Sequence, residues 1–307
     1  MGFTKVGLAL GAALLLRAAE AGAQAPYSLP WQLRPVAAGN VVRSDTAVAL
    51  MEDPATGDGG STVASMLLAS YKVTPALAPL VRLGLVRQSP PAGASSTALV
   101  NPALGALYGL KLSDTLKLGL FVGVTIPVGQ GGGNSPDAAR LAAAKAGILA
   151  RSAMDNAMFA VNDLTIFPGA GLAYVAGGLT VQGEVTVLQL FRVRGDEAPA
   201  AGMPPPNPDS KKTNSTMGLH VGYFVIPQIS LGGELRYQRW LSTPKAVDAD
   251  PTDTLRDNLT FAVGPRGHFQ LGEKVWLRPG VAYAQGLDDP MSAASYRIVK
   301  VDVPVEF

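Results

Sequence analysis

The last nine residues of the chain alternate strictly between apolar and polar side chains. The odd-numbered positions from Val299 to Phe307 are valine or phenylalanine, and the positions between them are lysine, aspartate, proline and glutamate. A period of two is the pattern of a β-strand with one apolar face and one polar face. The pattern predicts a strand over 296–307 that ends on an aromatic residue.

The same alternation recurs along most of the chain and is weakest in 40–52 and 158–175. It predicts about twelve strands, each close to the 9–11 residues with which a tilted strand crosses a bilayer. The predicted strands are 40–52, 62–73, 79–89, 99–112, 116–128, 158–175, 179–194, 215–226, 229–241, 257–271, 275–287 and 296–307.

The connections between these strands alternate between short and long. The short ones are 74–78, 113–115, 176–178, 226–228 and 272–274, and the long ones are 53–61, 90–98, 129–157, 195–214, 242–256 and 288–295. Tight turns at one end and long loops at the other are typical of an outer-membrane barrel. Closure of an even number of strands leaves no unpaired edge in the bilayer. The predicted fold class is therefore all-β, a closed antiparallel transmembrane β-barrel.

Composition agrees with this prediction. The chain is 48% hydrophobic and only 16% charged, whereas soluble domains carry about a quarter charged residues. It has no run of 18 apolar residues that would span a bilayer as a helix, and a barrel with a lipid face and a polar lumen needs none. A net charge of +2 is too small to favour nucleic-acid binding. The absence of cysteine is compatible with an exported protein but does not require one.

The N-terminal region has the pattern of a secretory signal peptide. Lys5 precedes the apolar stretch Val6–Leu16, and small residues follow. The motif Ala21-Gly22-Ala23 predicts cleavage after Ala23, so 1–23 is the expected signal peptide. Residues 24–39 are expected to be a periplasmic lead-in, although Trp31–Val36 is also compatible with an extended first strand. Residues 40–307 are expected to form the barrel.

These features resemble the family of Gram-negative outer-membrane β-barrels. The alternating C-terminal strand with Phe307 is similar to the signal that the barrel-assembly machinery recognises in that family. The resemblance implies an outer-membrane location, contact with its lipids and the assembly machinery as a partner. Within the family, Asn101–Gly105 and the hairpin containing Tyr108 and Leu118–Leu120 resemble FadL-type transporters of hydrophobic compounds. The chain lacks their N-terminal hatch and is short for their strand number, so no substrate is implied.

The alternation also predicts which side chains face the lumen. The predicted pore-lining residues are Arg43, Lys72, Arg82, Lys117, Glu184, Arg192, Glu234, Arg236, Arg266, His268, Arg278, Lys300 and Asp302, together with Asp45 and Asp163. Apart from the histidine, these are nine cations and five acids, and charges in a partly dry interior must pair. Two interpretations stay open: a structural ion-pair network, and a water-filled pore with mildly anion-favouring walls. They are compatible, because side chains only partly fill a barrel of this size.

The long loop 129–157 contains a predicted helix. Ser135 as the capping residue, Pro136 at the first position and Asp137 in the first turn are typical of a helix start. We expect this helix, which carries Arg140, Lys145 and Arg151, to fold into the barrel mouth and narrow it. The alternatives are a helix outside the mouth and a mobile loop.

No residues with the spacing of a catalytic site are visible. His220 and His268 are predicted at opposite ends of the barrel, so they cannot share a site, and neither has a serine or an acidic pair placed beside it by sequence. The glycines of 129–133 lack a following GK[ST], and the aspartates of 248–257 miss the calcium-loop frame. We therefore expect no enzyme activity, no cofactor and no metal.

Two functions remain. The first is an outer-membrane channel or passive transporter for small solutes, which selects by lumen size and wall charge. The second is a non-conducting barrel that anchors or braces an envelope complex for secretion, motility or surface assembly, with proteins of that complex as partners.

Overall fold

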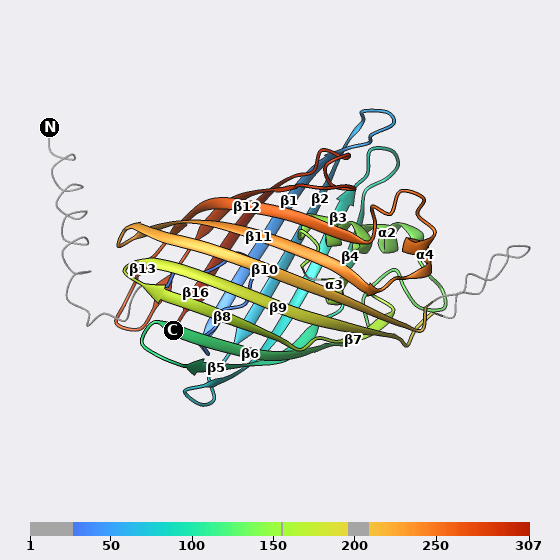
Figure 1. Cartoon of the computed structure of the whole chain (residues 1–307). Helices are drawn as coiled ribbons and strands as arrows, with labels where there is room; N and C mark the ends of the chain where they lie inside the picture. Colours follow the sequence, from blue (N-terminus) through green and yellow to red (C-terminus); the bar gives the residue numbers. More distant parts are fainter. Residues whose placement is uncertain (1–26, 155, 196–208) are drawn as a thin grey trace, which may run out of the picture.

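The computed structural model describes residues 27–154, 156–195 and 209–307, and these form a closed antiparallel β-barrel of twelve strands (Figure 1). β1 (Val41–Glu52) pairs with β2 (Gly59–Ser70) on one side and with β16 (Arg297–Glu306) on the other. The first and last strands therefore close the sheet, and the predicted fold class is confirmed.

Four of the twelve strands are each split into two segments. The remaining segments are β3 (Leu77–Ser89), β4 (Ser96–Leu99), β5 (Ala103–Lys111), β6 (Leu116–Thr125), β7 (Asp163–Ile166), β8 (Gly169–Ala176), β9 (Leu179–Arg192), β10 (Lys211–Ile226), β11 (Ile229–Ser242), β12 (Asp257–Gly267), β13 (Phe269–Gln270), β14 (Trp276–Leu277) and β15 (Gly280–Gly286). The divided strands are β4/β5, β7/β8, β12/β13 and β14/β15. Pro102, Pro168 and Pro279 lie in three of the four breaks, because proline has no N–H for the ladder.

The predicted strands correspond to the observed ones with one notable difference. The strand predicted over 158–175 begins only at Asp163, because the residues before it form the short helix α3 (Asn156–Phe159) and a turn. All four residues of α3 are buried. Side chains buried on every side of a segment do not alternate, which is why the pattern was weak there.

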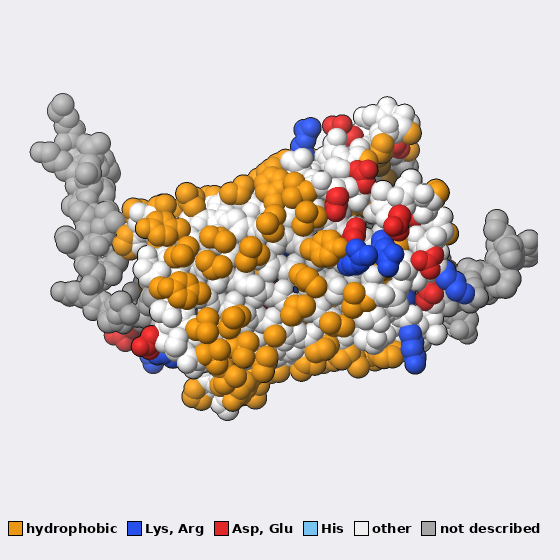
Figure 2. Space-filling model, in the orientation of Figure 1, with side chains coloured by type: hydrophobic (Ala, Val, Ile, Leu, Met, Phe, Trp, Pro, Cys, Tyr) orange, Lys and Arg blue, Asp and Glu red, His pale blue; other side chains and the backbone are white. Residues whose placement is uncertain are grey.

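The outer wall of the barrel is apolar. On β6, Leu120 and Val122 are 43% and 52% exposed, whereas Phe121 between them is 7% exposed. Figure 2 shows hydrophobic side chains spread over the strands, with charged side chains gathered at the end that carries the long loops. This distribution is that of a barrel surrounded by lipid, with a hydrated outer end. No helix in the described part of the chain is long and apolar enough to cross a bilayer.

The expected helix in the loop between β6 and β7 is α2 (Ala138–Ala150). Its N-cap is Asp137, whose carboxylate accepts a hydrogen bond from Arg140 N at 3.0 Å, and not Ser135 as expected. The buried face of α2 consists of Ala143, Ala144, Gly147 and Ala150, and it packs against β2, β3 and β4. The helix therefore lies within the mouth of the barrel. The other long loop with a helix carries α4 (Lys245–Asp248).

The residues before β1 differ most from expectation. Tyr27–Ala38 run through the barrel interior without forming a strand, where Trp31 is 1% and Leu33 0% exposed. The sequence had suggested a periplasmic lead-in or an extension of the first strand, and the structure places this segment in the lumen instead. The predicted signal peptide, with its cleavage site, lies outside the described residues.

Candidate functional site

We call Tyr27–Ala38 the inner segment, because it crosses the lumen in close contact with the wall. Glycines on the strands provide the space it occupies. A Cβ atom added to Gly218 on β10 would lie 2.7 Å from Leu33 Cδ1, and one added to Gly109 on β5 would lie 3.0 Å from Val36 O. The first distance is shorter than real Cβ contacts and the second is at the tight limit, so larger side chains at these positions would press on the inner segment.

Two buried carboxylates hold the backbone of the inner segment. Glu234 accepts a hydrogen bond from Trp31 N, and Glu184 accepts one from Arg34 N at 2.6 Å. The Arg34 guanidinium also pairs with Glu184 at 2.6 Å and lies 3.7 Å from the centre of the Phe121 ring. Two acids that were predicted to face the lumen therefore bind the inner segment. Its N–H groups satisfy these buried carboxylates, which need hydrogen-bond donors.

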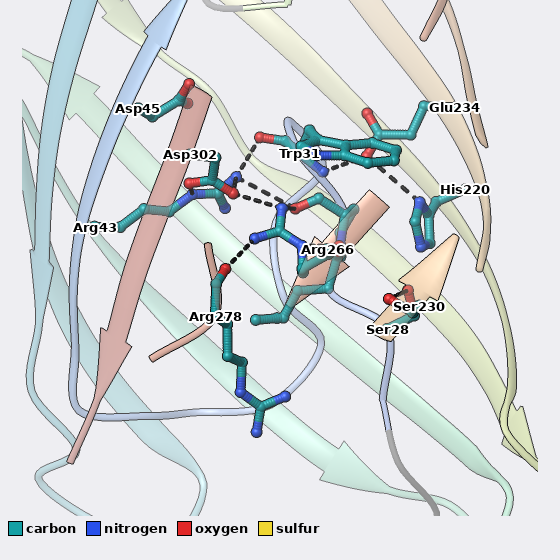
Figure 3. Close-up of polar contacts among 12 residues, drawn as sticks. Ser28, Trp31, Arg43, Asp45, His220, Ser230, Glu234, Arg266, Arg278 and Asp302 are labelled. Carbon is teal, nitrogen blue, oxygen red and sulfur yellow. Dashed lines mark hydrogen bonds and ion pairs between the residues drawn. The ribbon is translucent and has the colours of Figure 1, made fainter. Parts of the chain in front are cut away.

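Glu234 is shared with two wall residues. It forms an ion pair with Arg236, and its Oε1 lies 3.5 Å from His220 Nδ1. All three side chains are fully buried. Figure 3 shows His220 and Glu234 on the same side of Trp31. His220 therefore lies among structural contacts with Glu234 and the Trp31 ring.

A second cluster binds the carbonyl groups of the inner segment. Arg43 donates to Trp31 O, and Arg266 donates to Leu29 O at 3.0 Å. Asp302 lies between the two guanidinium groups, 2.7 Å from Arg43 Nε and 2.5 Å from Arg266 Nη2 (Figure 3). One carboxylate thus pairs with two cations, and the remaining donors of these cations hold the segment.

Hydroxyl and amide groups complete the contacts near the short-turn end. Ser28 Oγ donates to Ser230 Oγ at 3.0 Å, and Ser230 in turn lies 2.9 Å from His268 Nε2. Gln182 Nε2 donates to Arg34 O at 2.7 Å. His268, predicted to line the pore, lies in the lining of the lumen cavity described below and at the end of this hydrogen-bonded chain.

The loop between β6 and β7, residues 126–162, enters the lumen from the opposite end, and we call it the outer loop. Arg151 is 0% exposed and donates to both carboxylate oxygens of Asp45, at 2.6 and 2.5 Å. Gln32 Nε2 of the inner segment donates to Arg151 O at 3.0 Å, and Lys300 Nζ donates to Ser152 Oγ at 3.0 Å. The two inserted segments therefore meet inside the barrel.

Arg140 and Lys145, expected with Arg151 at the constriction, are exposed on the outer side of α2. The small apolar residues of α2 occupy the face toward the barrel, so its two charged side chains face away from the lumen. Of the three predicted constriction residues, the structure places only Arg151 inside.

The remaining predicted lumen cations are spread along the barrel. Lys72 is exposed just beyond β2, and Lys117 is half-buried with its ammonium 6.0 Å from the Tyr27 ring. Arg278 pairs with Glu306 at 3.1 Å. Arg192, at the long-loop end, donates to Gly195 O at 2.9 Å. These four residues do not form one ring, so no single charged constriction results.

Beside the inner segment lies a cavity of about 1680 Å³. It reaches the short-turn end, where residues 224–228 and 269–274 line it, and it extends inward to the outer loop. Its inner end is mainly apolar and is lined by Ala103, Leu107, Met154, Ala157, Met158, Phe167 and Leu188, with Arg34, Arg82 and Thr186 beside them. The interior of the barrel is therefore filled on one side and open on the other.

The acidic loop between β11 and β12 folds on itself. Asp250 accepts hydrogen bonds from the Thr252 hydroxyl at 2.7 Å and from Thr254 N at 3.0 Å. The hydroxyl of Thr252, followed by the backbone N–H groups, lowers the pKa of Asp250. Within the described residues, no three His, Cys, Asp or Glu side chains are grouped as metal ligands.

No family model matches the chain, and no curated protein does. Solved structures do. An outer-membrane channel from Pseudomonas putida F1 is 15% identical over 92% of this chain and 100% of that one, with a TM-score of 0.53. The KdgM porin is 11% identical over 87% and 99%, with a TM-score of 0.48. A FadL homologue from Pseudomonas aeruginosa is 10% identical over 88% and 90%, with a TM-score of 0.44.

Such low identities establish shared fold alone. The alternating wall, the closed ring of twelve strands and this similarity agree with one another. The chain has the fold of Gram-negative outer-membrane β-barrel channels.

Proposed function

We propose that this protein is an outer-membrane channel or passive transporter for small solutes. The observation that carries the proposal is the cavity of about 1680 Å³ between the inner segment and the wall. A barrel that served only as a brace would gain stability by filling this space with side chains, because packed interiors are favoured over empty ones. The cavity instead provides a route from the short-turn end to the underside of the outer loop.

In this proposal the inner segment is a fixed part of the wall. It is held by the Glu184, Glu234 and Asp302 contacts, and a hydrogen bond to a charged group contributes about 1.5–3 kcal/mol. Several such contacts together make spontaneous release of the inner segment rare. It narrows the lumen and leaves the solute path beside it.

The outer loop is the barrier in that path. Met154 and Met158 lie at the inner end of the cavity, and Arg151 ties the loop to Asp45 on β1. Movement of this one loop would join the cavity to the long-loop end of the barrel. Long loops in barrels commonly carry such functions because they are less constrained than the strands.

The cavity walls favour anions. Its lining contains seven lysine and arginine residues, of which the four arginines are ion-paired and the three lysines form no ion pair with a described residue. Rings and walls of one charge select ions of the opposite charge, so we expect modest preference for anionic solutes.

Conductance in planar lipid bilayers tests the proposal. We expect the purified chain to give small, infrequent steps, and a chain lacking 136–152 to give larger and more frequent ones, because the deletion removes α2 from the mouth. Lys245→Gln, an exposed change on α4, is the control and should behave as the unaltered chain. An unchanged conductance in the deletion variant would exclude the outer loop as the barrier.

A non-conducting barrel that anchors an envelope complex is the second candidate. The filled half of the lumen favours it, because ion pairs and the inner segment close much of the cross-section. If neither the intact chain nor the 136–152 deletion gives conductance steps, and the chain co-purifies with periplasmic proteins, the anchor replaces the channel.

A further inference from the structure

The wall of the cavity changes character along its length. Toward the outer loop it is mainly apolar, with Leu107 from β5, Leu188 from β9 and Met158 from the outer loop. The two cations at this end, Arg34 and Arg82, are paired with Glu184 and Asp45. Toward the short-turn end it carries cationic side chains, among them Lys72 and Lys117. We propose that the cavity binds a small amphipathic organic anion, with its apolar body under the outer loop and its carboxylate among these cations. This inference rests on the proposed channel function and names its solute class.

The apolar end is a built pocket with contributions from distant parts of the chain. Ala103 and Leu107 come from β5, Met154 and Met158 come from the outer loop, and Phe167 comes from the break between β7 and β8. Each methylene group transferred from water to such a surface contributes about 0.8 kcal/mol. A chain of several carbons or a ring therefore gains enough to bind.

The cationic end contains charges without acidic partners. Among the described residues no ion pair is formed by Lys117 or Lys72, and the nearest recorded contact of the Lys117 ammonium is the Tyr27 ring at 6.0 Å. Arg82 belongs to the other end of the cavity, where it lies 3.4 Å from Asp45, the partner of Arg151 in the outer loop. A carboxylate entering the cationic end would form charge-assisted hydrogen bonds with ammonium groups that now face the cavity.

The same features disfavour other solute classes. An organic cation would be repelled by Lys72, Lys117 and Lys274, which line the cavity and form no ion pair with a described residue. A sugar would have to bury hydroxyl groups against Leu107, Met158 and Leu188, which cannot form hydrogen bonds, and each unsatisfied group costs about 1–3 kcal/mol. The polar groups beside them, Arg34 and Thr186, already bind each other and Glu184. A neutral apolar molecule would fit the inner end but would gain nothing from the lysines.

Calorimetric titration of the full chain in zwitterionic lipid nanodiscs tests the inference, with empty nanodiscs as the blank. The probes are decanoate and decanamide, which have the same carbon chain and differ in charge. We expect decanoate to bind at least about tenfold more tightly, since hydrogen bonds to charged groups exceed neutral ones by roughly this factor. Equal affinities would overturn the proposed anion site.

Variants separate the two parts of the site. In Lys72→Gln/Lys117→Gln, decanoate binding should weaken about tenfold while decanamide binding stays the same, because only the charge contact is lost. Ala103→Phe should weaken the binding of both probes by filling the apolar end. Lys245→Gln is the matched control, a lysine outside the cavity, and should change neither. A double variant that retains full preference for decanoate would contradict the assignment.

Failure of this inference is distinguishable from failure of the channel proposal. Conductance without decanoate binding would overturn the anion site and leave the channel. Decanoate binding by a chain that never conducts, even without 136–152, would support the site and overturn the channel.

Discussion

The two halves of the barrel interior differ in composition and in occupancy. The strands from β9 to β12, with β16 and β1, place Glu184, Glu234, Arg266 and Asp302 inside, and all four are at most 7% exposed. The strands from β2 to β6 place mainly alanine, leucine and glycine inside, with the cavity against them. The inner segment lies against the charged half through its hydrogen bonds (Figure 3).

This difference shows how one β-barrel can be both braced and open. Buried charges must find partners, so the polar half recruits the backbone of the inner segment to satisfy them. The apolar half has no such requirement, and it meets the segment through packing contacts, such as Arg34 on the Phe121 ring and Val36 beside Gly109. The position of the charged residues thus decides where the lumen is filled and where space remains.

The largest expected effect follows from removing a carboxylate of the polar half. Glu234→Ala leaves the buried Arg236 guanidinium without its anion, and Trp31 N without its acceptor. Breaking a buried pair in this way costs about 3–5 kcal/mol, so we expect a clear fall in the temperature at which the barrel unfolds on a heat-modifiability gel. Glu273→Ala, in an exposed turn, should match the unaltered chain. Equal unfolding temperatures for both variants would show that the polar half does not brace the barrel.

A steric change at the contact between wall and inner segment should have the next largest effect. Gly218→Leu would place side-chain atoms where Leu33 lies, and overpacking costs about 1–3 kcal/mol. We expect the inner segment to move away from β10. This movement would be detected as faster proteolysis within the inner segment and as larger conductance steps. Gly183→Leu, on the neighbouring strand, meets nothing nearer than Gly218 O at 4.0 Å and is the control. Identical behaviour of the two variants would contradict the close packing of the segment.

Loosening the outer loop should have a smaller effect. Arg151→Gln removes the ion pair with Asp45 and leaves that carboxylate with Arg82 at 3.4 Å. Because α2 still packs on the inner wall, we expect more frequent conductance steps of unchanged size. Steps as large as those of the 136–152 deletion would show that Arg151 alone holds the loop.

The smallest effect is expected on the outer face of α2. Lys145→Gln changes an exposed side chain, and exposed substitutions of this kind alter stability by less than about 0.5 kcal/mol. Conductance and its preference for anions should remain those of the unaltered chain. A change in anion preference would show that Lys145 contributes to the constriction after all.

The wall could be predicted from sequence because each strand repeats a local rule. Because successive side chains on a strand point alternately to lipid and to the lumen, Leu120 is predicted outward and Phe121 inward without knowledge of the residues they contact. The same rule placed Glu184, Glu234, Arg266 and Asp302 in the interior. The rhythm of short and long connections gave the strand pairing, and the helix start near Asp137 gave α2.

The inner segment could not be predicted in this way. Its residues follow no strand or helix period, and its partners are distant, since Trp31 and Glu234 are 203 positions apart. A signal was present in Trp31 and Leu33, two large apolar residues ahead of the first strand, and in an excess of lumen charges that needed partners. The sequence also could not predict which face of α2 packs against the barrel wall, because alanine-rich helices are only weakly amphipathic.

Thiol labelling tests the division of the lumen most directly, because the native chain contains no cysteine. Leu80 on β3 lines the cavity, whereas Ser230 on β11 is 1% exposed behind Ser28 of the inner segment, and both lie near the short-turn ends of their strands. The folded variants Leu80→Cys and Ser230→Cys would each be treated with a water-soluble maleimide added at the short-turn side. Rapid labelling at 80 and slow labelling at 230 is the predicted result. Equal rates at the two positions would contradict a lumen that is filled on one side and open on the other.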